Sequence, residues 1–252
     1  MSGFSRRKLI ATGIAATAGA SGLAVGARLA RRYGLLPPDG AGIYGLGETL
    51  TYAAQRVLTR HSLAREFPRS LISKTPFANG EPPTGEPFRR LQEAGFADWR
   101  LAVDGMVARP ASFSIPELKS YPSSSQITHL ACEEGWSYIA EWTGVPLSHV
   151  LDAVGVLPQA KYVVYFSLQR GWWDSVDMAD ALHPQTLVAY GMNGGELPVG
   201  NGGPLRLRVP RQLGYKNVKY VTRLTVTDDL KRFGKGLGSA SPEGGYAWYA
   251  GI

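Results

Sequence analysis

Apolar and polar residues alternate along several short segments in the second half of the chain. Alternation with a period of two is the pattern of a strand that has one face in a core. It is clearest at 205–209 and 218–226, whereas 162–168 is an unbroken run of β-branched and aromatic residues, as expected of a buried strand. The predicted strands are 99–105, 126–131, 162–168, 187–192, 205–209 and 218–226. Because 99–105 ends in an Asp-Gly turn, Val107 is expected to open its partner strand.

Helical spacing of apolar residues is confined to brief segments. The predicted helices are 48–63, 114–120 with Ser114 as N-cap, 145–154 with Gly155 as C-cap, and 175–182. Since the helices are short and no regular β-α-β rhythm appears, the predicted fold class is α+β: one β-rich domain over 31–252, with a mixed, barrel-like sheet and short peripheral helices. The last stretch, 229–252, is expected to fold back on that body.

The N-terminus carries an export signal. Arg6 and Arg7 stand directly before an uncharged, only moderately apolar stretch that is rich in Ala and Gly, Leu9–Ala27. This arrangement is typical of twin-arginine export, so we assign residues 1–30 to a signal that is either cleaved after Ala27 or kept as a membrane tether. We therefore expect the protein in the periplasm or on the outer face of the cytoplasmic membrane.

Composition narrows the function classes. The formal charge is +7, but Lys and Arg are interspersed with acids rather than grouped in blocks, which argues against a nucleic-acid-binding face. The chain has a single cysteine, Cys132, at the end of the predicted strand 126–131. An unpaired thiol in an exported protein is a buried inert group, a nucleophile, an intermolecular bridge or a metal ligand.

The sequence around Cys132 resembles the sulfite oxidase-type molybdopterin oxidoreductases, in particular their bacterial exported branch, which includes periplasmic methionine sulfoxide reductase. The resemblance covers about 77–228 and is strong because several motifs occur in one order. They are Cys132 with Trp136-Ser137, Trp142-x-Gly144-Val145-Pro146-Leu147, Ala160-Lys161-Tyr162-Val163, Asp180–Leu187, Met192-Asn193-Gly194, Asn201–Leu207, Val209-Pro210 and Gly214-Tyr215-Lys216.

The resemblance implies a cofactor and its ligands. Cys132 would be the protein ligand of molybdenum, which is bound to a single pterin without an appended nucleotide. Arg206 would bind the pterin phosphate, and we expect Arg208 to face the opposite way. The remaining residues that the resemblance assigns to the cofactor are Asn79, Ser167, Asn201, Gly214, Tyr215 and Lys216.

The chain also departs from the animal and plant sulfite oxidases. Glu133 and Glu134 follow Cys132, and Trp172 occupies the segment in which those enzymes have a tyrosine. Acids beside the metal would repel sulfite, so reduction of a neutral S-oxide or N-oxide is favoured, with Cys132, Glu133 and Trp172 as catalytic residues. Oxidation of sulfite or a related sulfur compound is the alternative.

Partners follow from the same considerations. The sequence has no Cys-x-x-Cys-His haem motif and no iron–sulfur spacing, so we expect no haem and no iron–sulfur cluster, and electrons from a separate protein such as a membrane haem subunit. A monomer is expected, because the C-terminal dimerisation domain of sulfite oxidases is absent.

Two other classes of protein remain as rivals. A cysteine transpeptidase would use Cys132 as nucleophile with a base such as His129, His149 or His183. The other rival is a cofactor-free exported binding domain with aromatic contact residues.

Overall fold

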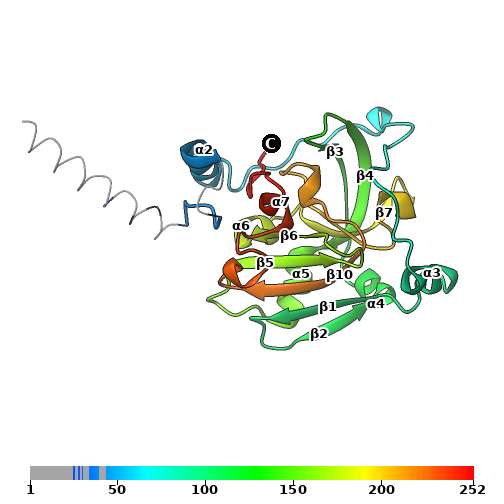
Figure 1. Ribbon diagram of the computed structural model, residues 1–252. Helices are drawn as coiled ribbons and strands as arrows, with labels where there is room; N and C mark the ends of the chain where they lie inside the picture. Colours follow the sequence, from blue (N-terminus) through cyan, green and yellow to red (C-terminus); the bar gives the residue numbers. More distant parts are fainter. Residues whose placement is uncertain (1–24, 26–27, 29, 31–33, 40–43) are drawn as a thin grey trace, which may run out of the picture.

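The computed structural model describes residues 25, 28, 30, 34–39 and 44–252, and its strands form two five-stranded sheets that run across one another in the view of Figure 1. Almost all of the predicted export signal lies outside the described residues, so that assignment stays a prediction. Among the residues described, no helix is long and apolar enough to cross a membrane.

The first sheet has the strand order β2-β1-β10-β5-β6. Its β1 and β10 strands pair in parallel and the other neighbours are antiparallel. The strands are β1 (Arg100–Gly105), β2 (Ala111–Ser114), β5 (Tyr162–Ser167), β6 (Trp173–Asp177) and β10 (Val221–Thr227). Since β1 and β10 are far apart in the sequence, this sheet joins the middle of the chain to its C-terminal part.

The second sheet has the order β3-β4-β7-β8, and β9 also pairs with β7. All its pairings are antiparallel. The strands are β3 (Ser124–Ala131), β4 (Ser137–Pro146), β7 (Leu187–Met192), β8 (Gly195–Glu196) and β9 (Arg206–Arg208). The β3 strand therefore delivers Cys132 to the end of this sheet, as the sequence predicts.

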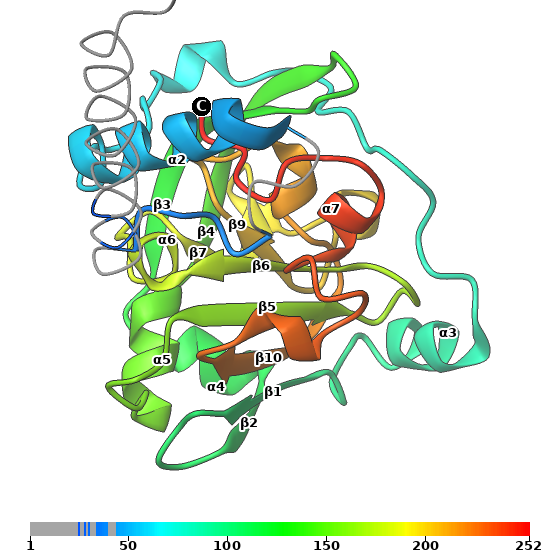
Figure 2. The ribbon, with the colours of Figure 1, turned by 60° about the vertical axis from the view of Figure 1, so that its left-hand side comes forward.

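The helices are brief and peripheral (Figure 2). They are α2 (Gly45–Leu58), α3 (Glu86–Glu93), α4 (Ile115–Ser120), α5 (Leu147–Val154), α6 (Met178–Ala181) and α7 (Ala240–Glu243). In the part of the chain that the structure describes, four single-turn 3-10 helices connect them and the strands: Arg69–Leu71, Val199–Asn201, Gly214–Lys216 and Leu230–Arg232. The α4 helix begins where predicted, because Ser114 and Glu117 form a reciprocal capping box, and α5 ends at Gly155 in a left-handed conformation.

Three apolar clusters hold these layers together. The largest lies between the first sheet and helices α4 and α5, and includes Trp99, Leu118, Leu151 and Leu224. A second forms on β4 and β7 around Trp142. A third covers the other face of β5 and brings together Tyr52 of α2, Val164, Leu230, Trp248 and Tyr249. The C-terminal segment thus folds back beside α2, as predicted, and both figures show the two side by side.

Several predicted elements are wrong in type or extent. Val107 forms an isolated bridge with Val156, and the partner of β1 is β2. The first three residues of the helix predicted at 175–182 belong to strand β6, and only the single turn α6 follows, while strand β4 occupies the first two residues of the helix predicted at 145–154. The helix predicted at 48–63 ends at Leu58, and the strand predicted from Val218 begins at Val221.

Candidate functional site

A cavity of about 460 Å³ opens where Cys132 meets the ends of β5 and β9. It brings together eight of the ten residues that the sequence assigns to a site: Asn79, Cys132, Glu133, Ser167, Trp172, Arg206, Gly214 and Tyr215. These residues come from six separate segments of the chain. Asn201 and Lys216 do not line the cavity.

Cys132 lies in a tight turn that joins β3 to β4. Its backbone N–H donates to the Trp136 carbonyl (2.9 Å), and the Gly135 N–H donates to the Cys132 carbonyl (3.1 Å). The Trp136 indole N–H donates to a Glu134 carboxylate oxygen at 2.7 Å. The turn therefore presents the thiol and both following acids to the same cavity.

The Cys132 thiol is protonated in this setting. Its Sγ lies 3.1 Å from Glu133 Oε2 and 3.9 Å from Glu134 Oε2. Burial above all, with the hydrogen bond to Glu133 and the charges of both acids, raises the pKa of Cys132 to about 12, although the Glu134 backbone N–H opposes the shift. A protonated thiol is a poor nucleophile, and among the described residues the Cys132 thiol hydrogen-bonds to glutamates rather than to a histidine. This arrangement does not support the transpeptidase alternative.

Gly214 closes over the thiol. A Cβ atom at this position would lie 3.3 Å from the Cα, Cβ and Sγ atoms of Cys132. The 3-10 turn Gly214–Lys216 can approach the thiol this closely because residue 214 has no side chain.

Arg206 and Arg208 lie on the same face of β9, so the expectation that they face opposite ways is wrong: residues two apart on a strand share a face. Both guanidinium groups lie over the Trp142 ring, at 5.1 and 5.4 Å. Only Arg206 lines the cavity. Arg208 is enclosed by hydrogen bonds to Asn217 Oδ1, Thr128 Oγ1 and the His129 carbonyl.

Arg206 retains an unused donor. Its Nη1 and Nη2 donate to the carbonyls of Asn201 and Asn217, both at 2.6 Å, while its buried Nε has no partner. The buried Nδ2 of Asn201 also lacks a partner. Of these two residues only Arg206 lines the cavity, so its free Nε is placed to donate to an acceptor bound there.

Lys219 is a second cation at the cavity, and sequence reasoning missed it. Its Nζ donates to the carbonyls of Asn79 and Gly200. Burial, and then the charge of Arg206, lowers the pKa of Lys219 to about 8. The ion pairs found among the described residues include neither Arg206 nor Lys219, so this end of the cavity fits a phosphate. The usable signal was the Val-Lys-Tyr sequence directly before β10.

Lys216 takes a different role from the one predicted. Its Nζ is fully buried and forms an ion pair with Asp174 Oδ1 at 2.6 Å, with a further hydrogen bond to the Ser175 carbonyl. The ammonium therefore points away from the cavity toward β6. Only the backbone of the 214–216 turn remains available to a ligand.

The remaining predicted residues form the mouth and walls. The Ser167 hydroxyl accepts from the Gln169 N–H at 3.0 Å, and the Tyr215 hydroxyl donates to the Ala247 carbonyl at 2.7 Å. The Tyr215 ring packs on Tyr246, another residue lining the cavity, at 5.3 Å. Trp172 is 58% exposed and forms an aromatic part of the cavity rim.

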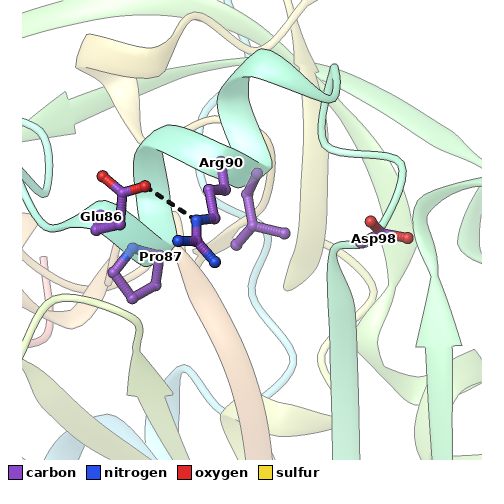
Figure 3. A pocket seen from close by; sticks show the side chains of 5 residues that line it. Glu86, Pro87, Arg90 and Asp98 are labelled. Carbon is purple, nitrogen blue, oxygen red and sulfur yellow. Dashed lines mark hydrogen bonds and ion pairs between the residues drawn. The ribbon is translucent and has the colours of Figure 1, made fainter.

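A second hollow lies beside α3, lined by Glu86, Pro87, Arg90, Leu91 and Asp98 (Figure 3). Glu86 already pairs with Arg90 at 2.9 Å, so this hollow offers no comparable set of unpartnered groups. Among the described residues, no group of three or more His, Cys, Asp or Glu side chains could hold a metal ion. A metal at Cys132 would thus need ligands that the protein does not supply, which fits a metal brought in by a cofactor.

Comparison with known proteins agrees with this geometry. The chain is 37% identical to the provisionally named protein-methionine-sulfoxide reductase subunit YedZ1 of Azospira oryzae over 191 residues, which are 76% of this chain and 69% of that protein. It is 33% identical to the catalytic subunit MsrP of the protein-methionine-sulfoxide reductase of Xanthomonas axonopodis pv. citri over 160 residues, 58% of this chain. The chain spans about half the length of that relative.

A solved structure shares the fold. The sulfane dehydrogenase SoxCD of Paracoccus pantotrophus superimposes with a TM-score of 0.51 at 27% identity, over 53% of this chain and 39% of that one. The family model described as "Oxidoreductase molybdopterin binding domain" matches residues 89–232, more than half of the chain. That segment contains Cys132, Ser167, Arg206 and the 214–216 turn, and the chain therefore belongs to the molybdopterin-binding oxidoreductases.

Proposed function

We propose that this oxidoreductase reduces a neutral sulfoxide by oxygen-atom transfer, with methionine sulfoxide in proteins as the first candidate substrate. The observation that carries the proposal is the cavity itself, which holds a single thiol flanked by two acids at one part of its wall and unpaired cations at another. The names of the Azospira and Xanthomonas relatives support the choice of substrate.

Different residues of the cavity bind the metal and the phosphate of the cofactor. A bound molybdenum–pterin group supplies a metal that exchanges two electrons and an oxygen atom with a substrate. Cys132 is the thiolate ligand; to serve it must lose its proton, and Glu133 Oε2, 3.1 Å away, is placed to accept that proton. Arg206 and Lys219 bind the pterin phosphate.

The acids select substrate charge. Glu133 and Glu134 both face the cavity beside Cys132, so an anion at this position meets like charge. Two unit charges about 4 Å apart repel by about 1 kcal/mol in water and about 4 kcal/mol near a protein surface. A neutral sulfoxide escapes this cost, whereas sulfite does not.

The finer assignments belong to the same proposal. Two cations suit one phosphate, which supports a single pterin without an appended nucleotide. Electrons come from a separate redox protein, such as a membrane haem subunit. The protein is exported by the twin-arginine route to the periplasm or the outer face of the cytoplasmic membrane, and acts as a monomer.

Metal and phosphorus analysis tests the cofactor. Protein from a molybdenum-replete host should contain about one molybdenum and one pterin phosphate per chain. Cys132→Ser should lose the molybdenum, because a hydroxyl poorly replaces a soft thiolate, while Ser137→Ala, an exposed position at the end of the same turn, should keep it. Full metal content in Cys132→Ser would refute the ligand assignment.

A dye-coupled assay tests the direction of oxygen-atom transfer and the identity of the substrate. Sulfoxide reduction with a reduced dye should proceed, and sulfite oxidation should be slow. Glu133→Gln and Glu134→Gln should raise residual sulfite oxidation without raising sulfoxide reduction. Rapid oxidation of sulfite or another reduced sulfur compound, with no sulfoxide reduction, would instead favour the alternative suggested by the structural likeness to a sulfane dehydrogenase.

A further inference from the structure

The α2 helix buries polar side chains and exposes apolar ones, the reverse of an ordinary amphipathic helix. Its buried side chains are Glu48, Tyr52 and Arg56. Large apolar side chains point to solvent instead: Leu46 is 79% exposed, and Leu50, Val57 and Leu58 are 67%, 65% and 77% exposed. Leu46, Leu50 and Val57 recur at intervals of four and seven residues, so they form one stripe along the helix, opposite the buried polar face.

The buried polar face is fixed in place. Arg56 Nε lies 2.8 Å from Asp177 Oδ2, and Arg56 Nη2 lies 2.7 Å from Asp180 Oδ2. The Tyr52 hydroxyl donates to Asp177 at 2.8 Å, and Glu48 Oε1 accepts from the Trp248 N–H at 3.0 Å. Rotating α2 to cover its leucines would break these bonds and leave the carboxylates of Asp177 and Asp180 without Arg56. The apolar stripe is therefore held outward by the fold.

The surroundings of the stripe are apolar and basic. Leu63 is a further exposed leucine (63%) in the segment that follows the helix. Arg60 and Arg65 in the same segment are exposed, and neither takes part in an ion pair with the described acids. An outward apolar helix face that is followed directly by unpaired cations complements an anionic lipid surface.

The place of α2 in the chain points the same way. Only residues 28–44 separate Gly45 from the uncharged sequence Leu9–Ala27. With 14 residues, α2 is too short to span a bilayer. Contact between α2 and a bilayer therefore means that the helix lies along the membrane surface.

We propose that the stripe Leu46, Leu50, Val57 and Leu58 docks the protein on the surface of an anionic lipid bilayer, with α2 parallel to the membrane plane. Docking would also orient the cavity. The Tyr44 hydroxyl, just before α2, donates to the Gly245 carbonyl at 3.1 Å, and the adjacent Gly244 and Tyr246 line the cavity. The cavity mouth is thereby held close to the membrane side of the molecule. This proposal does not depend on the substrate.

Nitroxide accessibility on the full chain tests the docking locally, so that binding through the N-terminus cannot imitate it. Leu50→Cys and the control Leu182→Cys, an exposed leucine outside α2, are labelled separately. The unsubstituted chain, which has Cys132 alone, gives the background. Vesicles contain phosphatidylcholine and phosphatidylglycerol at roughly three to one.

On these vesicles the label at position 50 should gain access to oxygen and lose access to a water-soluble nickel complex, changing their ratio several-fold. The label at position 182 should not change. Adding Leu46→Gln and Val57→Gln should return position 50 to its value in water, whereas Leu157→Gln, another exposed leucine, should not.

Two results would overturn the proposal. Position 50 could stay water-accessible while the chain is bound to vesicles, which would leave the stripe for a protein partner. Alternatively, position 50 could be shielded before vesicles are added, which would mean that another segment of the chain covers it.

Discussion

Arg206 and Arg208 project from one face of β9 and share the Trp142 ring, but their other contacts assign them different tasks. Arg206 lines the cavity, whereas Arg208 does not and donates to Asn217, Thr128 and His129 inside the protein. Arg206→Met should therefore reduce pterin phosphate content strongly, and it should also lower stability because it leaves the Asn201 and Asn217 carbonyls without this donor.

Arg208→Met should also lower stability, because it leaves buried acceptors unsatisfied at about 1–3 kcal/mol each, but it should keep the pterin phosphate. Urea unfolding of the two cofactor-free variants, together with phosphorus analysis of the loaded ones, measures the contrast. Equal cofactor loss in both variants would show that the phosphate lies beyond the reach of Arg206.

Lys219 makes cofactor retention dependent on pH. Its pKa of about 8 in the empty cavity means that it is charged below that pH and increasingly neutral above it. A bound anion would raise the pKa of Lys219. Above about pH 8, anion binding must therefore protonate the Lys219 amine, so phosphate retention should weaken as pH rises.

Lys219→Arg keeps its charge at all these pH values, so it should remove the slope without removing binding. Phosphorus retained after dialysis between pH 7 and pH 10 is the measurement. An identical slope in the arginine variant would assign the pH dependence to another group.

At the scale of elements, the turn after the 3-10 helix Val199–Asn201 positions Lys219. Gly202 has φ +107, and a Cβ there would lie 2.8 Å from Lys219 Cγ. Gly202→Ala should lower the free energy of unfolding by more than the roughly 1–3 kcal/mol that backbone strain alone costs. It should also displace the Lys219 side chain from the cavity.

Gly245→Ala is the matched control, since Gly245 has φ +93 but nothing within 4 Å of an added Cβ. The difference between the two variants in free energy of unfolding isolates the clash. Cofactor content should fall only in Gly202→Ala. Equal destabilisation, with cofactor content unchanged, would contradict this role for the turn.

Two of the strands that sequence reasoning missed, β6 and β4, contain buried polar residues. In β6, Asp174, Ser175 and Asp177 are all buried, so the period of two disappears and the segment reads as a helix. Their partners, such as Lys216 for Asp174, lie some forty residues away and no local pattern reveals them. The same holds for β4, which has buried residues on both faces and no alternation to recognise.

The elements that were predicted correctly depended on local chemistry. Ser114 with Glu117 is a capping signal within four residues, and β3 alternates up to Cys132. Asn79, Ser167 and Arg206 were assigned from family motifs rather than from spacing, and the structure places all three at one cavity. Lys219 was missed because the short sequence Val-Lys-Tyr before β10 does not reveal which cavity its side chain reaches, and its depressed pKa exists only in the folded protein.

At the scale of the whole molecule, the two ends of the described chain are joined by buried charges. Arg56 of α2 contacts Asp177 and Asp180, and Gln212 donates to the same Asp180 carboxylate at 2.5 Å. Gln212 also accepts from the Ala250 N–H through its side chain. One buried network thus connects α2, α6 and the C-terminal segment that lines the cavity.

Arg56→Met should therefore destabilise the whole protein by about 3–5 kcal/mol, because it leaves two buried carboxylates without their main cation. Arg223→Met, which breaks the exposed pair with Asp104, should cost less than about 1 kcal/mol. Urea unfolding at pH 7 compares the two variants. A similar small loss in both would show that the network relaxes or admits water when Arg56 is removed.

Acid should weaken the same network. Burial alone would raise the pKa of Asp180, but the hydrogen bonds and charge of Arg56, with the charge of Arg211, hold that pKa below its ordinary value of 3.8. A depressed carboxyl pKa contributes stability above pH 3.8, which is lost as pH falls through the folded-state value. Burial raises the pKa of Asp177, which therefore acts in the opposite sense.

Asp180→Asn should flatten the decline in unfolding free energy below about pH 4. A decline as steep as that of the unsubstituted protein would mean that other carboxylates govern acid unfolding and that Arg56 holds α2 chiefly through Asp177.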